Sequence, residues 1–242
     1  MPINRKFWMS CLTFLTCTLP PSAQAVNVTV TPLVMEINSA MRLGTETRME
    51  NLGTEASTFT VEVVKWTQVN GQDVYQPTRD VVVTPARFTV QGKQGQVIRF
   101  GLRKKPEGTE ISYRVFITEI PEANAPTREI QKDGVTAQLT TALRMSLPLY
   151  FTDPAAKSDM NVQLLQDAEG LFVKVSNSGT RREVFRNPEV VYNNQKFKLE
   201  TRTALAGSTL VYRLPNSLSW KGPVRVNFVQ GSENRNVELV LP

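Results

Sequence analysis

Apolar residues recur at every second position from Val135 to Leu149, with Thr141 as the one polar member of the row. A period of two places such a row on one face of a β-strand, so the stretch predicts a strand with two chemically different faces. Typical strands have about five to six residues, so a run of this length predicts passage through more than one packing environment. Its apolar row is either core or an edge onto which a strand of another chain docks.

The rest of the chain consists of short β-rich segments separated by turn residues, such as those at Asn51-Leu52-Gly53 and Asn70-Gly71. No segment keeps a sustained helical period. Regularly spaced short strands predict an all-β fold made of sandwiches. A second β-rich block follows residues 155–160, which have the character of a linker. We therefore predict two β-sandwich domains in series, at 26–154 and 155–242.

The first 25 residues have the features of a secretory signal peptide. Arg5 and Lys6 form a basic start, residues 7–19 are mostly apolar, and Ala23-Gln24-Ala25 is an A-x-A cleavage site. The apolar stretch is too short for a membrane span, and no later stretch is long enough. We expect a mature chain that begins at Val26, is exported to the periplasm and is not embedded in a membrane.

Composition excludes several classes of function. The sequence has no histidine, and both cysteines, Cys11 and Cys17, lie in the predicted signal peptide. These absences remove the usual general base and the usual zinc ligands, and no paired carboxylates stand out, so we predict neither an enzyme nor a metal or cofactor site. Loss of Arg5 and Lys6 lowers the formal net charge from +6 to +4, which gives no reason to expect a nucleic-acid partner.

Five segments stand out for their order and spacing along the mature chain: Val81 to Pro85, Phe88 to Val90, Gly95 to Arg99, Tyr113 to Pro121 and Leu147 to Phe151. In this order and spacing the chain resembles the periplasmic chaperones of the chaperone–usher pilus pathway. The resemblance implies two immunoglobulin-like domains arranged as an L or boomerang. It also implies pilus or fimbrial subunits and an outer-membrane usher as partners.

The resemblance further implies a mechanism in which the chaperone completes its subunit. Pilus subunits are sandwiches that lack their last strand, and the chaperone lends alternate apolar side chains of its own long strand, which is donor-strand complementation. On this chain the donated row is Val135, Ala137, Leu139 and Thr141. The alternative is that these four residues are ordinary core of the first domain. The polar loop from Pro121 to Gly134 is either a disordered surface loop or, in line with the resemblance, a segment that becomes an ordered strand only when a subunit binds.

The chaperones of this family also hold the C-terminal carboxylate of the subunit with two cations. The usual first-strand Arg position falls on Pro32 here, which cannot bind a carboxylate. A variant branch carries an Arg after a Pro-Ala step, and Arg87 occupies that position. We therefore expect Arg87 to be the anchor, with Arg144 or Arg114 assisting, because a guanidinium binds carboxylates in a bidentate manner. Alternatively, each is a solvated charge on a strand edge.

A last implied feature is a buried charge cluster that joins the two domains. Arg99 and Glu110 match two of its members, and the third, which is acidic in the family, falls on Ser219. The cluster is therefore either incomplete here or uses another partner, such as Asp159 or Asp167. Two other classes of function remain open at this point. One is a structural or adhesive surface protein, which would polymerise, and the other is a carbohydrate-active enzyme, which would hydrolyse a glycan.

Overall fold

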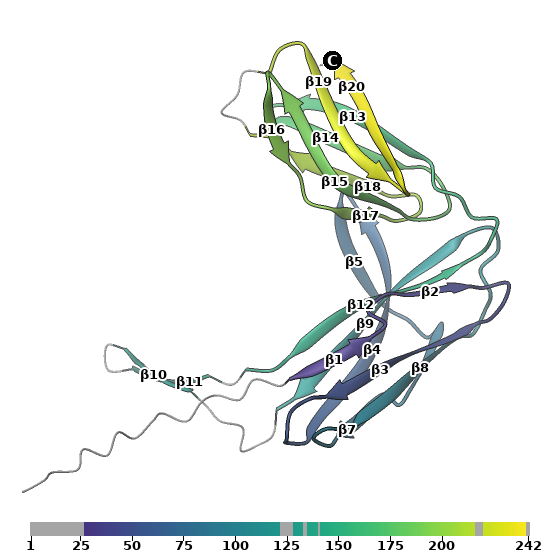
Figure 1. The fold of residues 1–242 in the computed structure, drawn as a ribbon, viewed down its shortest axis with the longest axis vertical. Helices are drawn as coiled ribbons and strands as arrows, with labels where there is room; N and C mark the ends of the chain where they lie inside the picture. Colours follow the sequence, from purple (N-terminus) through teal and green to yellow (C-terminus); the bar gives the residue numbers. More distant parts are fainter. Residues whose placement is uncertain (1–26, 122–127, 133–134, 140, 216–219, 241–242) are drawn as a thin grey trace, which may run out of the picture.

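A computed structural model describes residues 27–121, 128–132, 135–139, 141–215 and 220–240. Every regular element in these residues is a β-strand, and the strands form two lobes that meet at an angle (Figure 1). The predicted all-β fold is confirmed. We use "first lobe" for the strands up to β12 and "second lobe" for those from β13 onward.

The first lobe contains two sheets. One has four strands, in the order β1 (Val28–Thr31), β3 (Gly44–Asn51), β8 (Gly95–Leu102) and β6 (Val81–Thr84). The other runs in the order β2 (Met35–Asn38), β12 (Arg144–Thr152), β9 (Glu110–Ile120), β4 (Ser57–Val69) and β5 (Gln72–Pro77), and β7 (Arg87–Val90) also pairs with β4. Alternating side chains of both sheets form one core, whose largest fully buried members include Phe59, Phe100 and Phe151.

The second lobe is built in the same way, with a separate core around Phe185, Leu210 and Val226. Its three-stranded sheet has the order β13 (Met160–Asp167), β14 (Gly170–Asn177) and β18 (Thr209–Arg213). Its other sheet runs β16 (Gln195–Lys198), β15 (Glu183–Tyr192), β19 (Pro223–Gln230) and β20 (Glu233–Val240), with β17 (Arg202–Ala204) also paired to β15.

The predicted long strand is divided in two, which corrects the sequence-based expectation. Residues 144–152 form β12, whereas Val135–Leu139 forms β11, which pairs with β10 (Arg128–Lys132) in a separate antiparallel hairpin. Part of the expected polar loop is therefore a strand. The break has a physical cause: the partner strand β9 ends at Ile120, and its last bond to this segment is donated by the Glu119 N–H to the Leu143 carbonyl over 2.8 Å.

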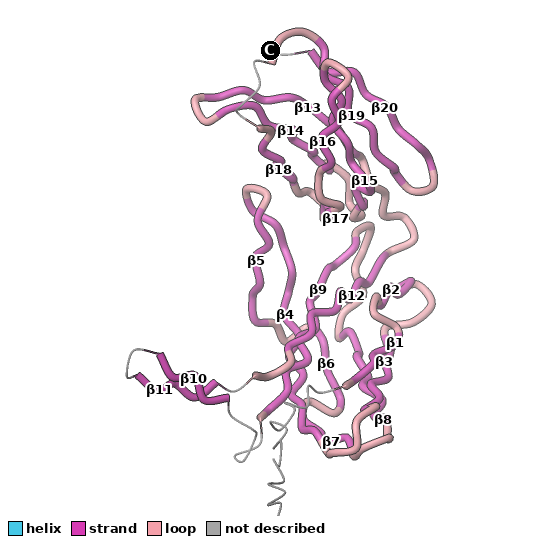
Figure 2. Tube along the Cα trace, turned by 60° about the vertical axis from the view of Figure 1, so that its left-hand side comes forward, coloured by secondary structure: helices cyan, strands magenta, loops and turns pink. Residues whose placement is uncertain are grey.

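The β10–β11 hairpin projects away from the first lobe in both views (Figures 1 and 2). Within the described residues, β11 is hydrogen-bonded to β10 and to neither sheet of the first lobe. The alternating segment is thus held outside the sandwich that precedes it.

The start of the chain changes sheets at Pro32. β1 pairs with β3 in one sheet, and β2 then runs parallel to β12 in the other. The crossing places Leu33 and Val34 at the surface, 60% and 53% exposed respectively. Two apolar side chains are therefore presented beside β12, directly before β2 begins.

Candidate functional site

The outer face of the larger first-lobe sheet carries a lattice of aromatic and cationic side chains. Phe59 points into the core, so its neighbours in β4, Thr60 among them, point outward. Cross-strand pairing places Thr60 beside Thr118 of β9, and Thr118 beside Arg144 of β12. On the other side of β4, Thr60 is paired with Arg87 of β7. Two of the three predicted anchor arginines therefore stand at opposite ends of one row.

The third arginine lies nearer the second lobe on the same face. The guanidinium carbon of Arg114 lies 3.8 Å from the centre of the Trp66 ring, a cation–π contact. Arg114 Nε and Trp66 Nε1 are both buried and have no hydrogen-bond partner among the described residues. Two donors that lack an acceptor thus lie side by side. Buried polar groups are rarely left in this state.

Arg144 is held at the start of β12 by an aromatic neighbour. Its guanidinium carbon lies 4.2 Å from the centre of the Phe116 ring, and Tyr75 packs edge-on against the same ring at 5.5 Å. The Arg144 and Arg87 side chains are both exposed. Since neighbouring strands are about 4.8 Å apart, the three steps from β12 to β7 separate their backbones by about 14 Å.

One edge of β12 is open over half its length. On one side β12 pairs with β9 from Arg144 to Thr152, but on the other side β2 pairs only with Leu149 to Thr152. Residues 144–148 therefore present an unpaired edge within the described part of the chain, beside the exposed Leu33 and Val34. The predicted donor residues Val135, Ala137 and Leu139 lie in β11, and Thr141 is exposed between β11 and β12. An unpaired edge of this kind is a template for another strand.

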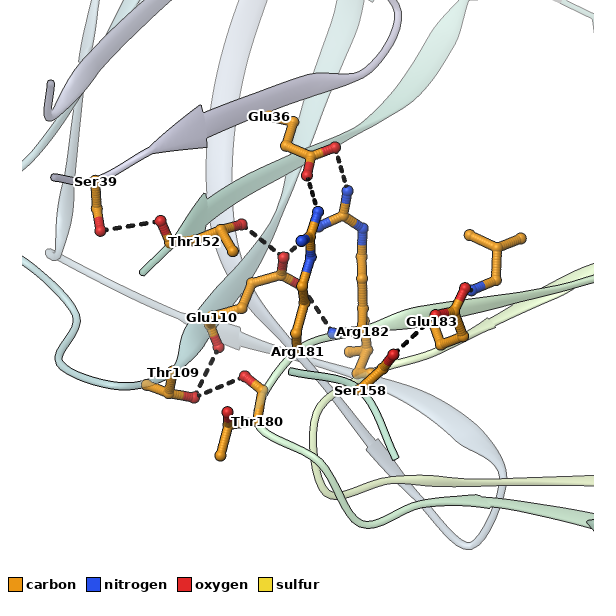
Figure 3. A network of polar contacts seen from close by, with 12 residues as sticks. Glu36, Ser39, Thr109, Glu110, Thr152, Ser158, Thr180, Arg181, Arg182 and Glu183 are labelled. Atoms are coloured by element: carbon orange, nitrogen blue, oxygen red, sulfur yellow. Dashed lines mark hydrogen bonds and ion pairs between the residues drawn. The ribbon is translucent and has the colours of Figure 1, made fainter. Parts of the chain in front are cut away.

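The two lobes are joined by a partly buried group of charges centred on Glu110, which we call the Glu110 network (Figure 3). The side chain of Glu110 is fully shielded from solvent and forms an ion pair with Arg182 of the second lobe. Glu110 also accepts hydrogen bonds from the Thr152 hydroxyl at 2.6 Å and from the Arg182 backbone N–H at 3.2 Å. Glu36 of β2 completes the network by accepting from Arg181 at 2.8 Å and from Arg182 at 2.6 Å.

The composition of this network corrects the expectation for its members. Arg99 takes no part: its side chain is 68% exposed and pairs with Glu46 at 3.3 Å on the outer face of the smaller sheet. Asp159 accepts from the Ser178 hydroxyl, and Asp167 accepts from the backbone N–H groups of the turn before β14, so neither substitutes for a missing member. Ser219 lies outside the described residues.

Burial at the joint affects a tyrosine as well as the charges. Tyr150 contacts Trp66 and, together with Leu205 of the second lobe, forms a small apolar cluster. Burial raises the pKa of Tyr150 to about 12, although the nearby charges of Arg182 and Arg114 act to lower it. The Arg182 guanidinium stacks over the Tyr150 ring at 3.6 Å, which connects this apolar cluster to the Glu110 network.

Sequence reasoning did not identify Glu36, Arg181, Arg182 or Trp66 as members of these sites. The single local signal is the adjacent pair Arg181-Arg182 four residues after Asn177, where a turn ends. The basic members Arg181 and Arg182 come from the second lobe and the acidic members from the first, whereas the expected basic member, Arg99, belongs to the first lobe. No three metal-ligating side chains come together in the described residues, and no helix there could cross a membrane.

Residues 20–157 match the family model described as pili and flagellar-assembly chaperone, PapD N-terminal domain. No curated protein sequence matches the chain significantly.

Several solved structures are similar in fold, each with a match probability of 1.00. A chain of the CsuC–CsuE chaperone–tip adhesion subunit pre-assembly complex, from archaic chaperone–usher Csu pili of Acinetobacter baumannii, has 16% identity and a TM-score of 0.65, with 89% of this chain and 99% of that one covered. The YadV chaperone has 14% identity and a TM-score of 0.64, covering 88% and 99%. The Salmonella enterica SafA pilin–SafB chaperone complex has 16% identity and a TM-score of 0.59, covering 90% and 98%. At these identities the likeness shows a shared fold.

Proposed function

Because the chain belongs to the family of pili and flagellar-assembly chaperones, we propose that it binds pilus subunits in the periplasm and delivers them to an outer-membrane usher. The segment at 26–154 provides the subunit-binding domain, the segment at 155–242 provides the second domain, and residues 1–25 direct export. The solved relatives include chaperones in complex with a tip adhesion subunit and with a pilin, which supports subunits of this kind as the partner.

The observation that carries the proposal is the open edge of β12 together with the free hairpin that precedes it. An incomplete sandwich exposes an apolar groove and unpaired edges, which would otherwise aggregate. The Val135, Ala137, Leu139 and Thr141 row enters the groove, and main-chain bonds along the open edge at 144–148 fix the register. A shift by one residue would turn every donated side chain away from the groove, so the register must be locked.

We assign the binding of the subunit's C-terminal carboxylate, which fixes this register, to Arg144, with Arg114 assisting. A subunit strand on the open edge lies one strand spacing, about 4.8 Å, from β12 and four spacings, about 19 Å, from β7. Arg144 is therefore within reach of the end of that strand, whereas Arg87 is not. Arg114 lies further along the same face, where its guanidinium covers the Trp66 ring. This geometry favours Arg144 and Arg114 over Arg87.

The donor row is tested by Leu139→Asp, because a charge forced into an apolar groove is strongly disfavoured. Co-expression with a subunit from a neighbouring gene should show loss of subunit recovery from periplasm, while the melting temperature of the purified chaperone is unchanged. Leu165→Asp is the matched control and should leave subunit recovery unchanged, because it makes the same substitution at an exposed position on β13 of the second lobe. A large fall in melting temperature with Leu139→Asp would identify Leu139 as core and overturn its assignment as a donor residue.

The anchor is tested by Arg144→Ala beside Arg87→Ala. Loss of a desolvated charge-assisted contact should weaken subunit capture by about 2–4 kcal/mol in the Arg144 variant. Arg144→Lys should recover only part of this affinity, because an ammonium lacks the planar fork of donors. Arg87→Ala should bind as the parent does. If the two alanine variants behave in the opposite way, the lock belongs to Arg87.

A further inference from the structure

Gln68, at the end of β4, connects the two lobes through all of its hydrogen-bonding positions. On the first-lobe side its Nε2 donates to Asp73 Oδ1 at 2.9 Å. On the second-lobe side the same Nε2 donates to the Thr203 carbonyl at 2.9 Å, and Oε1 accepts from the Leu205 N–H at 3.0 Å and the Ser208 hydroxyl at 2.7 Å. A glutamine amide has two donors and one oxygen with two acceptor sites, so none is left unused.

The hairpin that carries Gln68 reaches the second lobe at its tip. Figure 2 shows the β4–β5 hairpin rising from the first lobe to the level of β17 and β18. The Gly71 carbonyl accepts a hydrogen bond from Arg202 of β17. A Cβ on Gly71 would lie 3.3 Å from the Val211 nitrogen, and its φ of +76° is strained for other residues. The tip thus fits closely against the second lobe.

This joint is distinct from the Glu110 network. The network is charged and involves β2, β9 and the turn after β14, whereas the Gln68 joint is formed by a neutral amide on the β4–β5 hairpin. The apolar cluster of Trp66, Tyr150 and Leu205 lies between them. A single polar joint would leave the lobes free to rotate about it. Two joints on either side of an apolar contact determine one orientation.

We propose that Gln68, together with the Glu110 network, sets the angle between the two lobes, and that it does so as a positioning residue rather than a subunit contact. Its amide also connects to the aromatic lattice, because Asp73 accepts from the Tyr75 hydroxyl at 3.3 Å and Tyr75 packs on Phe116. The orientation of the second lobe is therefore linked to the face that carries Arg144 and Arg114. This inference goes beyond the proposed function, since it concerns the shape of the free protein.

The most informative substitution is Gln68→Glu, which keeps the size and shape of the side chain. One carboxylate oxygen retains the bonds that Oε1 accepts, but both donors are lost. The oxygen that replaces Nε2 would then face Asp73 Oδ1 and the Thr203 carbonyl without an intervening proton. Gln76→Glu is the matched control. It adds the same charge to the same hairpin, at an exposed position of β5. Gln68→Ala is a second variant, because it removes every bond without adding repulsion.

The lobe angle is measured as the distance between two spin labels, on Gln91→Cys in the first lobe and Gln163→Cys in the second, both exposed positions. Cys11 and Cys17 are replaced by serine, so no other thiol competes for label. The parent and Gln76→Glu should give one narrow distance distribution. Both Gln68 variants should give a broader or shifted distribution. The circular dichroism spectrum of the protein should be the same in all of them, because both lobes stay folded. A distribution in both Gln68 variants that matches the parent would overturn the proposal. Because no subunit is present, the result is independent of the proposed function.

Discussion

Glu110 and Glu46 are both carboxylates paired with an arginine, but water reaches only one of them. The Glu110 side chain is 0% exposed and its partner Arg182 is 10% exposed, whereas Glu46 and Arg99 are 60% and 68% exposed. Exposed pairs contribute about 0–1 kcal/mol, because water and salt screen them. Removal of one partner of a buried pair costs about 3–5 kcal/mol, because the other charge remains without a counter-ion.

We therefore expect Glu110→Ala to lower the free energy of unfolding by about 3–5 kcal/mol. Arg182 would keep only the partly exposed Glu36 as a counter-ion, and the buried Thr152 hydroxyl would lose its acceptor. Glu46→Ala, which removes a carboxylate paired with an exposed arginine, should change it by less than about 1 kcal/mol. The free energy of unfolding of both variants is measured by urea titration, with tryptophan fluorescence as the signal. Equal effects of the two substitutions would show that the Glu110 network adds nothing beyond a surface ion pair.

A second residue-scale prediction concerns alkaline pH. The pKa of Tyr150 is raised to about 12 in the folded protein, against about 10 in an unfolded chain. The folded state therefore holds its proton to higher pH. Protonated Tyr150 therefore makes its full contribution to the free energy of unfolding below about pH 10. This contribution falls as the pH rises towards about 12, by up to about 1.4 kcal/mol per pH unit. Tyr150→Phe cannot titrate, so urea midpoints at pH 9.5 and 11.5 should differ less for this variant than for the parent. An identical loss in both proteins would contradict the assignment.

At the scale of elements, the linker between the lobes is packed on one glycine. A Cβ on Gly179 would lie 2.3 Å from the Lys157 carbonyl oxygen and 2.6 Å from the Asp159 nitrogen, distances at which the backbone must move. Backbone hydrogen bonds join the same turn to the linker. In one of them, the Thr180 N–H donates to the Lys157 carbonyl at 2.8 Å. It also leads directly to Arg181 and Arg182.

Gly179→Ala should therefore lower the free energy of unfolding by about 1–3 kcal/mol, the range for overpacking. Gly101→Ala serves as the control. A Cβ on Gly101 of β8 would have no neighbour within 4 Å. Its effect should stay within about 0.5 kcal/mol. Thermal melting of the two variants decides the point, and a neutral Gly179→Ala would mean that the linker can move aside without cost.

At the scale of the whole molecule, the position at which the mature chain begins is open to direct measurement. Ala23-Gln24-Ala25 predicts cleavage before Val26, and the residues up to 26 lie outside those the structure describes. The intact mass of protein recovered from the periplasm should match residues 26–242. A mass that retains residues 1–25 would refute the predicted processing site. Ala23→Lys, which disrupts the A-x-A pattern, should retain the longer form.

Sequence periodicity was sufficient to predict the all-β fold and many of its strands, but β10 lies in a segment that was expected to be a loop. A strand places alternate residues on opposite faces, and this rule depends only on neighbours in the chain. Leu147 and Leu149 were members of the alternating row, and both are buried in the first-lobe core. The same periodicity continues without interruption through residues 140–143. Periodicity could not show where the strand divides, because the division depends on where β9, a different segment of the chain, ends.

The charge contacts were decided only by the tertiary structure. Glu110 and Arg182 are 72 positions apart, and nothing in either neighbourhood distinguishes Arg182 from Arg99 as a partner. Any arginine can pair with any carboxylate, so the choice depends on which strands the fold brings to the joint and which side chains it shields from water. The sequence by itself determined which residues form strands and which faces are apolar, because those properties are local. The joint between the lobes, and the face on which Arg114 and Arg144 stand together, exist only once the sheets have assembled.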